Sequence, residues 1–532
     1  MLQLSETEFL DLASRHQIVP VYKKIQADSR SPVALFACFQ EGPFNYLLES
    51  AEQDGKIGRY SFIGLDYYEV IKFQKGILTR SKPASGAPEP GQTGSSEPYF
   101  SLETNQPLEA LQEILEEYQG PQLEDLPLFY GGAVGYLSYD MAGYFEDVAN
   151  PDQEDDLGMP EMFYILSDTL IIYDHLEETI KIVKNIKTGS QDRKELQNNY
   201  HRAKKYLEEI SARIAAASRK PAAINSKKSA CGEELLADKI QNNTRKAGGD
   251  NPDTNDFTSS MSPSRFKARV RQIKDHIARG DIFQAVLSQR LSLTTRASGF
   301  EIYQKLRRIN PSPYMYYLDL DEFEIIGSSP EVLVRVEDGV VYNRPLAGTR
   351  KRGKDPAEDE NLARDLKQDK KERAEHMMLV DLGRNDVGRV SSYGTVQVEE
   401  LMGVEYYSHV MHLFSSITGN LSPDSTPFQA LEACFPAGTV SGAPKIKAME
   451  IINRLEPVRR GPYAGSLGYF GYSGNLDSCI TIRTILLQNE TAHVQAGAGI
   501  VHDSQPEKEY QETLDKAEAL LQAVREAGGE RK

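Results

Sequence analysis

The segment SCITIRTILLQNETAHVQAGAGIV, residues 478–501, decides the fold class of this chain. It contains two runs rich in β-branched residues, at 478–487 and 491–501, which predict two strands in direct succession. A doubly wound fold would instead alternate strands with helices at regular intervals. Because strands arrive in runs and helical patterns lie elsewhere, we predict an α+β fold built on antiparallel sheets.

Composition narrows the class of protein. The chain has 532 residues, 39% hydrophobic and 26% charged, which is typical of a soluble globular protein with two large domains or about three smaller ones. No window approaches the ~18 apolar residues of a membrane span, and residues 1–16 lack a secretory signal, so we expect a cytoplasmic protein without a membrane partner. A net charge of −17 disfavours nucleic acid as a partner. The four cysteines form no CxxC pair, which argues against a zinc ribbon or a disulfide framework: Cys38, Cys231, Cys434 and Cys479.

A change of composition divides the chain into two domains. Segment 215–262 is polar, poor in aromatic residues and rich in Asn, Lys, Ser and Asp, which is typical of a linker. Amphipathic helical patterns flank it, at 195–217 and at 265–280. We therefore predict domains at 1–214 and 263–527.

The densest acidic run of the chain lies in the first domain. EDVANPDQEDDLGMPE, residues 146–161, has seven acids and no base, so we interpret it as a solvated loop. An anionic ligand bound to so acidic a chain would need local cations, a metal or helix N-termini.

The chain also contains one internal echo. YGGAVGYLSY at 130–139 and YAGSLGYFGY at 463–472 match at five of ten positions. Both predict glycine-punctuated strands, on which another backbone or a ligand can come close. The echo indicates either two related sheets facing each other or a chance similarity.

Two predicted amphipathic helices, 369–386 and 506–527, each carry an ExxE pair with both glutamates on one helical face. The apolar run 377–380 should seat the first helix against a core. If the helices face each other, four carboxylates converge, and such a cluster is tolerable only when protons or a cation neutralise it. Oxygen ligands without nearby His and Cys favour Mg²⁺. A lone ExxE pair is more often two exposed helix charges, so the case for a metal site depends on the neighbouring motifs.

Several residues of the second domain suit an anionic ligand, each with a structural alternative. Thr439 in FPAGTVSGAPKIK precedes a predicted helix whose free N–H groups could bind an anion, or which is simply capped. Arg483 stands among apolar residues of a predicted strand, where a guanidinium needs a planar anion. Gly497 and Gly499 admit a ligand against bare backbone or mark a bulge. Tyr463 either bonds a carboxylate or packs in the core.

Together the motifs resemble the chorismate-utilising enzymes, and within them the component I family of anthranilate synthases. The blocks that carry the resemblance span both halves of the chain: LLES at 47–50, NPSPYMYY at 310–317, GSSPEVL at 327–333, RPLAGTRKRG at 344–353, the ExxEH helix, HVMHL at 409–413, FPAGTVSGAPK at 435–445, RRGPYAGSLGYF at 459–470, IRT at 482–484, QAGAGIV at 495–501 and EYQET at 509–513. The resemblance implies a two-lobed fold in which antiparallel sheets pack as a β-sandwich with helices outside. It also makes the first domain regulatory and the second chorismate-binding.

The resemblance implies a set of chorismate-binding residues, with the ring carboxylate of chorismate held through Mg²⁺. These residues are Glu375 and Glu512 as primary Mg²⁺ ligands with Glu372 and Glu509 close by, Gly348 and Thr349 at the ring, Tyr463, Arg483, Gly497, Ala498 and Gly499 at the enolpyruvyl carboxylate, and Thr439 and Lys516 completing the polar lining.

The implied reaction is addition of ammonia to the chorismate ring with loss of its hydroxyl, followed by elimination of pyruvate to give anthranilate. Glu331 stands where relatives carry the general acid, although a glutamate at a helix N-terminus is its alternative. His412 would help the elimination, or is a core histidine. Gln284 replaces the lysine base of isochorismate and salicylate synthases, and Ala347 replaces a lysine of aminodeoxychorismate synthases, so ammonia and the ortho product are implied.

The resemblance also implies a partner and an inhibitor. None of the four cysteines has the GxCxG-like setting of a glutaminase nucleophile, so a separate glutamine amidotransferase subunit should supply ammonia. An aminodeoxychorismate synthase and an inactive tryptophan sensor are the alternatives. A tryptophan feedback site would be formed by Glu49, Ser50, Pro313, Tyr314, Met315, Leu467 and Tyr469.

Overall fold

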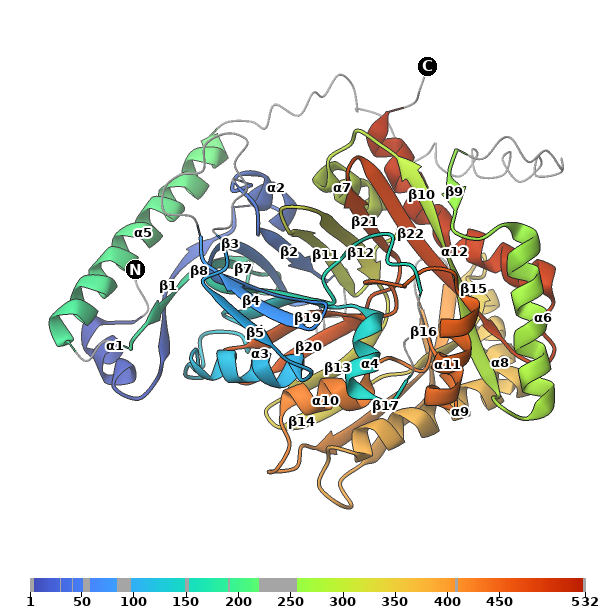
Figure 1. Ribbon diagram of the computed structural model, residues 1–532. Helices are drawn as coiled ribbons and strands as arrows, with labels where there is room; N and C mark the ends of the chain where they lie inside the picture. The colour runs from blue at the N-terminus through green and yellow to red at the C-terminus, as the bar shows by residue number, and fades with distance from the viewer. Residues whose placement is uncertain are drawn as a thin grey trace.

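Helices surround a large network of antiparallel strands (Figure 1). The computed structural model describes residues 4–28, 30–40, 42–50, 58–83, 97–148, 153–189, 192–219, 256–406 and 410–529. Within these ranges every pairing between named strands is antiparallel. The predicted α+β class with antiparallel sheets is confirmed, whereas packing as a β-sandwich stays a prediction.

The N-terminal half combines antiparallel strands, some of whose neighbours are not consecutive in the chain, with several helices. Its elements are α1 (Glu6–Ala13), β1 (Ile18–Gln26), α2 (Pro32–Ala37), β2 (Tyr46–Glu49), β3 (Tyr60–Gln74), β4 (Ile77–Ser81), β5 (Phe100–Glu103), α3 (Pro107–Glu116), β6 (Gly132–Leu137), the 3₁₀ turn η1 (Tyr139–Met141), α4 (Ala142–Phe145), β7 (Met162–Asp174), β8 (Thr179–Lys187) and α5 (Arg193–Arg219).

The C-terminal half carries the helices of the predicted site. Its elements are β9 (Thr258–Ser259), α6 (Pro263–Arg279), β10 (Gln284–Thr294), α7 (Gly299–Ile309), β11 (Tyr314–Asp319), β12 (Glu324–Ser329), β13 (Val332–Glu337), β14 (Val340–Asn343), β15 (Leu346–Lys351), α8 (Pro356–Gln368), α9 (Lys370–Gly388), β16 (Gln397–Tyr406), β17 (Val410–Asn420), α10 (Pro427–Cys434), β18 (Gly442–Ala443), α11 (Lys445–Leu455), β19 (Ser466–Gly471), β20 (Leu476–Ile480), β21 (Thr484–Gln488), β22 (Thr491–Ile500) and α12 (Pro506–Gly528).

Two strand pairings join the halves: β2 with β11 and β6 with β19. The second pair contains the internal echo, with Gly135 opposite Gly468. A Cβ on Gly468 would lie 2.1 Å from the Asp477 carbonyl oxygen of the neighbouring strand, so glycine is needed there. The hypothesis of two facing sheets is wrong, because the two segments lie edge to edge in one sheet.

Two large apolar clusters form the core. One lies where α3, α9 and α10 cover the strands, and the other lies under α1, α5, α7 and α12. Figure 1 shows α1 and α5 at one end of the molecule and α6, α11 and α12 at the other. Burial of these helix faces fixes α9 and α12, which carry the ExxE pairs, against the strands.

The predicted linker falls mostly outside the described residues. Helix α5 continues past residue 214 to Arg219, and the description resumes at Asp256. Helix α6 begins at Pro263, where the second domain was predicted to start, and the Ser262 side chain accepts from the N–H of Arg265 as its N-cap. The division into domains stays a prediction. In the described ranges, no helix is both long and apolar enough to cross a membrane.

Candidate active site

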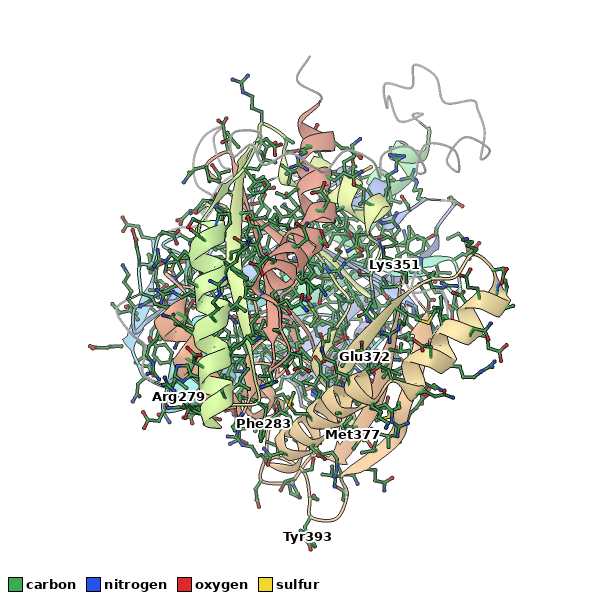
Figure 2. All side chains as sticks on the ribbon, turned by 90° about the vertical axis from the view of Figure 1, so that its right-hand side faces the viewer. Arg279, Phe283, Lys351, Glu372, Met377 and Tyr393 are labelled. Atoms are coloured by element: carbon green, nitrogen blue, oxygen red, sulfur yellow. The ribbon has the colours of Figure 1, made fainter. Side chains whose placement is uncertain are left out.

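The predicted site residues gather where α9 packs on β15 and β17 and where α12 packs on β22. Figure 2 looks onto this side of the molecule, with Glu372 and Met377 on α9 and Lys351 at the end of β15. Asp369 caps α9, since its side chain accepts from the N–H groups of Lys371 and Glu372. The helix start is thereby fixed directly before the first glutamate of the ExxE pair.

The apolar run of α9 is only half buried. His376, Leu379 and Val380 face the core, whereas Met377 is 36% exposed. The expectation that the whole run seats the helix is therefore wrong for Met377, because consecutive residues lie about 100° apart on a helix. Glu375 is half buried beside this core face.

The ExxE pairs of α9 and α12 are close enough to interact. Burial raises the pKa of Glu375, and the charges of Glu372 and of Glu512 on α12 raise it further. Burial also raises the pKa of Glu509, again with a contribution from Glu512. Two helices therefore direct like charges at one region, as the sequence predicted.

The four glutamates do not form one tight cluster. Glu372 accepts from Arg350 at 3.0 Å, and Glu512 pairs with Lys516 at 2.8 Å. Within the described ranges, no three His, Cys, Asp or Glu side chains are placed to hold a metal ion together. What the geometry offers a divalent ion is the Glu375 and Glu512 pair, and Mg²⁺ is commonly held by one or two carboxylates, waters and substrate oxygens. The donor set therefore fits Mg²⁺ in that form, and the identity of the ligands stays a prediction.

Gln284 links Glu375 of α9 to β22, the strand that contains Gly497 and Gly499 and is called the glycine strand below. Its Nε2 donates to Glu375 Oε1 at 3.4 Å, while its buried Oε1 has no partner. A Cβ on Gly499 would lie 2.6 Å from that Nε2. Gln284 is therefore an amide wedged between Glu375 and β22, with one acceptor left for a ligand.

His412 lies on β17 opposite Thr349 of β15. Its Nδ1 is 3.1 Å from the Gly348 carbonyl oxygen and 3.0 Å from Thr349 Oγ1. A carbonyl can only accept, so the proton is assigned to Nδ1 and Nε2 is the basic nitrogen. Burial and then Arg483 lower the pKa of His412, which keeps the imidazole neutral near pH 7. Gly348 adopts φ +71°, where a side chain would be strained and would approach Glu372.

Glu331 is the most perturbed carboxyl of the site. It is buried, 7% exposed, and burial raises its pKa to about 8. The nearby Thr439 hydroxyl and Leu346 N–H favour the ionised carboxylate and so oppose this rise in pKa. Thr439 Oγ1 is buried and makes no hydrogen bond of good geometry with the described residues. A carboxyl with this pKa keeps its proton at neutral pH.

Arg483 is not in a strand, contrary to the prediction from SCITIRTILL. Strand β20 ends at Ile480 and β21 begins at Thr484, and Arg483 between them adopts φ +52°. Its carbonyl accepts from the N–H of Ser328, which holds the break in place. Burial lowers its pKa, and no ion pair in the described part of the chain involves its guanidinium. A strained, desolvated and unpaired cation is a strong anion-binding group.

Lys516 and Tyr463 both approach Gly497 of β22. Lys516 on α12 donates to the Gly497 carbonyl oxygen at 3.0 Å. A Cβ on Gly497 would lie 2.7 Å from the Tyr463 hydroxyl, and Ala498 is buried within the same strand. The structure therefore places Lys516 and Tyr463 at Gly497, Gln284 at Gly499, and His412 at Gly348 and Thr349, whereas Ala498 packs in an apolar core cluster.

All seven residues predicted for tryptophan line a second cavity of about 80 Å³. They are Glu49, Ser50, Pro313, Tyr314, Met315, Leu467 and Tyr469. The buried Ser50 hydroxyl has no partner, and Glu49 accepts from Tyr303 and, at 3.0 Å, from Arg307.

Sequence reasoning missed part of this cavity. Tyr60 and Phe62 line it from β3, and Asp477 accepts from the Tyr314 hydroxyl at 2.8 Å. Alternation along β3 could have found the two aromatics, since residues i and i+2 share a face of a strand. No local signal marks Asp477, because only the fold brings its side chain to that of Tyr314.

The acidic run is not simply a solvated loop. Asp156 pairs with the buried Arg290, and Glu161 lies 3.5 Å from Arg459. The Glu154 carbonyl accepts from the N–H of Arg459. The prediction was wrong for these residues because their basic partners are distant in sequence and lie on β10 and on the segment before β19.

Comparison with known proteins defines the class. The model of chorismate binding enzymes matches residues 87–522, and the chain belongs to that family. It is 45% identical to anthranilate synthase component 1 of Acetivibrio thermocellus over 97% of each chain, and 41% identical to that of Aquifex aeolicus over 98% of each. The crystal structure of anthranilate synthase component I from Streptococcus pneumoniae aligns with a TM-score of 0.69 and 36% identity, covering 87% of this chain and 92% of that one. The resemblance to anthranilate synthase component I is confirmed.

Proposed function

We propose that the chain is the ammonia-using component of an anthranilate synthase and converts chorismate and ammonia to anthranilate and pyruvate in tryptophan biosynthesis. The observation that carries this proposal is Glu331, a buried acid with a pKa of about 8 in the same site as the unpaired Arg483. Loss of a ring hydroxyl needs a proton donor at neutral pH, and a dicarboxylate substrate needs a cation.

Substrate binding is assigned to the cations and the bare backbone. Arg483 takes the enolpyruvyl carboxylate in a forked pair, with the Tyr463 hydroxyl and the 497–499 backbone beside it. Lys516 already touches the Gly497 carbonyl oxygen and supplies a second positive charge. These groups offset locally the net charge of −17.

Glu331 and His412 divide the proton transfers. As ammonia bonds to the ring carbon next to the carboxylate-bearing one, Glu331 gives its proton to the departing hydroxyl, which leaves as water. Nε2 of His412 then takes the ring C–H proton while the C–O bond breaks, and the enolpyruvyl group leaves as an enolate that takes up a proton to become pyruvate. Gln284 cannot activate water as a lysine base would, which favours ammonia as the nucleophile.

Mg²⁺ is proposed as the cofactor, held by Glu375 and Glu512 with Glu372 and Glu509 nearby. When bound it supplies positive charge to the ring carboxylate of chorismate. The raised pKa of Glu375 supports this assignment, since a cation is the simplest way to relieve repulsion between like carboxylates.

The chain is also proposed to work with a partner subunit, to be inhibited by tryptophan and to be located in the cytoplasm. A separate glutamine amidotransferase subunit supplies ammonia in the cytoplasm, where the pathway operates. Tryptophan binds at the cavity that contains Glu49 and Ser50 and inhibits by favouring an unproductive arrangement of the two halves. The cavity is lined by residues of both halves, from β2 and β3 and from β11, β19 and β20.

Purified protein with chorismate, Mg²⁺ and an ammonium salt tests the proposal. Fluorescent anthranilate and pyruvate should appear together and only with both additions. An aminodeoxychorismate synthase would consume chorismate without releasing pyruvate, and an inactive tryptophan sensor would leave chorismate unchanged. Either result would reject the proposed function.

A further inference from the structure

A buried ion pair lies next to the segments that carry Thr439, Tyr463 and the glycines of β22 in the candidate active site. Arg460 and Glu456 are 3% and 4% exposed. The guanidinium donates from Nε to Glu456 Oε2 at 2.8 Å and from a terminal nitrogen to Oε1 at 2.7 Å. Glu456 directly follows α11, and Arg460 lies in the segment that leads to β19.

The remaining donors of Arg460 bond to two separate segments of the candidate active site. One terminal nitrogen donates to the Val440 carbonyl oxygen at 2.8 Å, and the other to that of Val286 at 2.7 Å. Val440 directly follows Thr439, and Val286 is paired with Gly499 across β10 and β22. One guanidinium thus ties the Thr439 segment to the glycine strand.

Glu456 and the Tyr463 ring complete the arrangement. Glu456 Oε1 accepts from both the N–H and the hydroxyl of Ser288, at 2.7 and 2.9 Å, and Ser288 is paired with Gly497. The guanidinium carbon of Arg460 lies 5.6 Å from the centre of the Tyr463 ring. The pair therefore contacts the Tyr463 ring, the segment that contains Thr439, and the two β10 residues that are paired with Gly497 and Gly499.

The N-terminal half holds the same segment from the outside. The N–H of Tyr139 donates to the Gly461 carbonyl oxygen at 2.8 Å, and the N–H of Gly461 donates to Asp140 at 2.9 Å. The Tyr139 ring packs 4.4 Å from the Arg460 guanidinium. Arg460 is consequently fixed on both sides, by η1 and by Glu456.

We propose that Arg460 and Glu456 are positioning residues that set the spacing between Thr439, Tyr463 and the 497–499 backbone, and so determine how tightly the enolpyruvyl carboxylate is bound. This inference rests on the proposed function for its kinetic part. Stability alone is a poor account of the pair, because a buried ion pair can often be replaced by apolar side chains without loss of stability. The four hydrogen bonds that the two side chains make to backbone and Ser288 groups instead specify geometry.

The kinetic test compares Arg460→Lys with Arg80→Lys. Arg80 forms the same forked pair with the buried Glu69, at 2.7 and 2.8 Å, but on β4 of the N-terminal half. Lysine keeps the charge and loses the fork in both variants. Arg460→Lys should raise the KM for chorismate about tenfold and lower kcat/KM about 100-fold, since a misplacement of about 1 Å can cost that much. Arg80→Lys should leave the KM within about twofold at a similar loss of melting temperature. A chorismate KM that is equal in both variants and wild type would overturn the proposal.

Hydrogen–deuterium exchange of the full chain gives a readout that needs no activity. Peptides covering 459–465 and 436–443 should exchange about tenfold faster in Arg460→Lys than in wild type. In Arg80→Lys the exchange rates of these peptides should equal those of wild type. If wild type does not convert chorismate, the proposed function fails while this comparison still decides the inference. Unchanged exchange in both peptides rejects it.

A paired variant covers failure to fold. Arg460→Met combined with Glu456→Met removes both charges together and leaves no unpaired buried ion. This variant should fold, show the same faster exchange and have the raised chorismate KM. A folded paired variant with wild-type exchange and KM would show that the pair positions nothing.

Discussion

Glu331 and Glu49 are both buried carboxyls, 7% and 6% exposed, yet their surroundings differ. Glu49, at the predicted tryptophan cavity, accepts from Tyr303 and pairs with Arg307 at 3.0 Å. Glu331, at the candidate active site, has no ion pair among the described residues, and its pKa rises to about 8. Burial without a cation partner therefore makes Glu331 a proton donor, whereas Glu49 is held by a cation and a hydroxyl.

Glu331→Gln is the strongest test of this difference. Glutamine keeps the shape but cannot give a proton, so turnover of chorismate with ammonia should fall about 10³-fold. Turnover should also fall as pH rises through about 8, because Glu331 loses its proton there. Anthranilate fluorescence, corrected for the free ammonia concentration, measures both effects. The control Glu49→Gln should keep turnover within about threefold, and an equal loss in the two variants would remove the distinction between them.

Glu375→Gln tests whether the glutamates of α9 and α12 form a metal site. Removing one charge should lower Mg²⁺-dependent turnover more than about 100-fold and raise the Mg²⁺ concentration needed for half activity. Chelation of wild type should abolish turnover, with recovery on adding Mg²⁺. The matched change Glu509→Gln on α12 should cost less, because Glu509 is expected only near the ion. Unchanged turnover of Glu375→Gln would exclude that residue from the mechanism.

Ser50→Phe tests the other cavity. A phenyl ring should occupy much of the 80 Å³ and raise the tryptophan concentration for half inhibition more than about tenfold. Turnover without tryptophan should stay within about twofold, since Ser50 does not line the candidate active site. Inhibition curves with and without the change measure both. Persistent inhibition would mean that tryptophan binds elsewhere.

The two sites were predictable from sequence to different extents. Amphipathic spacing and paired glutamates give α9 and α12 from physical pattern alone, and both helices form as expected. LLES, by contrast, carries no physical signal, and only the resemblance to a family pointed to Glu49 and Ser50. Asp477 was missed altogether because strand pairing, not local pattern, places it in the cavity.

The errors share a physical cause. The break at Arg483 was invisible in an apolar run, since a positive φ depends on the hydrogen bond to Ser328 rather than on residue type. The acidic run was misjudged because Arg290 and Arg459, which hold it, are distant in sequence. Long-range partners decide both cases, and local composition does not encode them.

Tyr314→Phe gives the smallest and most specific effect. It removes the hydroxyl that donates to Asp477, whose pKa burial raises to about 6 despite this bond and nearby Arg335. A raised folded-state pKa means that the contribution of Asp477 to stability is complete below its unfolded pKa of ~3.9 and is lost as pH rises through about 6. Without the donor the ionised form is costlier still, so the variant should lose about 1–2 kcal/mol at pH 8 and less at pH 5.

Urea unfolding at the two pH values measures this difference, and Tyr316→Phe is its control. Tyr316 bonds the neutral Thr484 hydroxyl at 2.6 Å, so its loss should cost about 1 kcal/mol at both pH values. A pH-independent cost for Tyr314→Phe would mean that Asp477 does not ionise in the cavity. Asp477 would then be a neutral hydrogen-bonding group, and of the two acids in the cavity only Glu49 forms an ion pair, with Arg307.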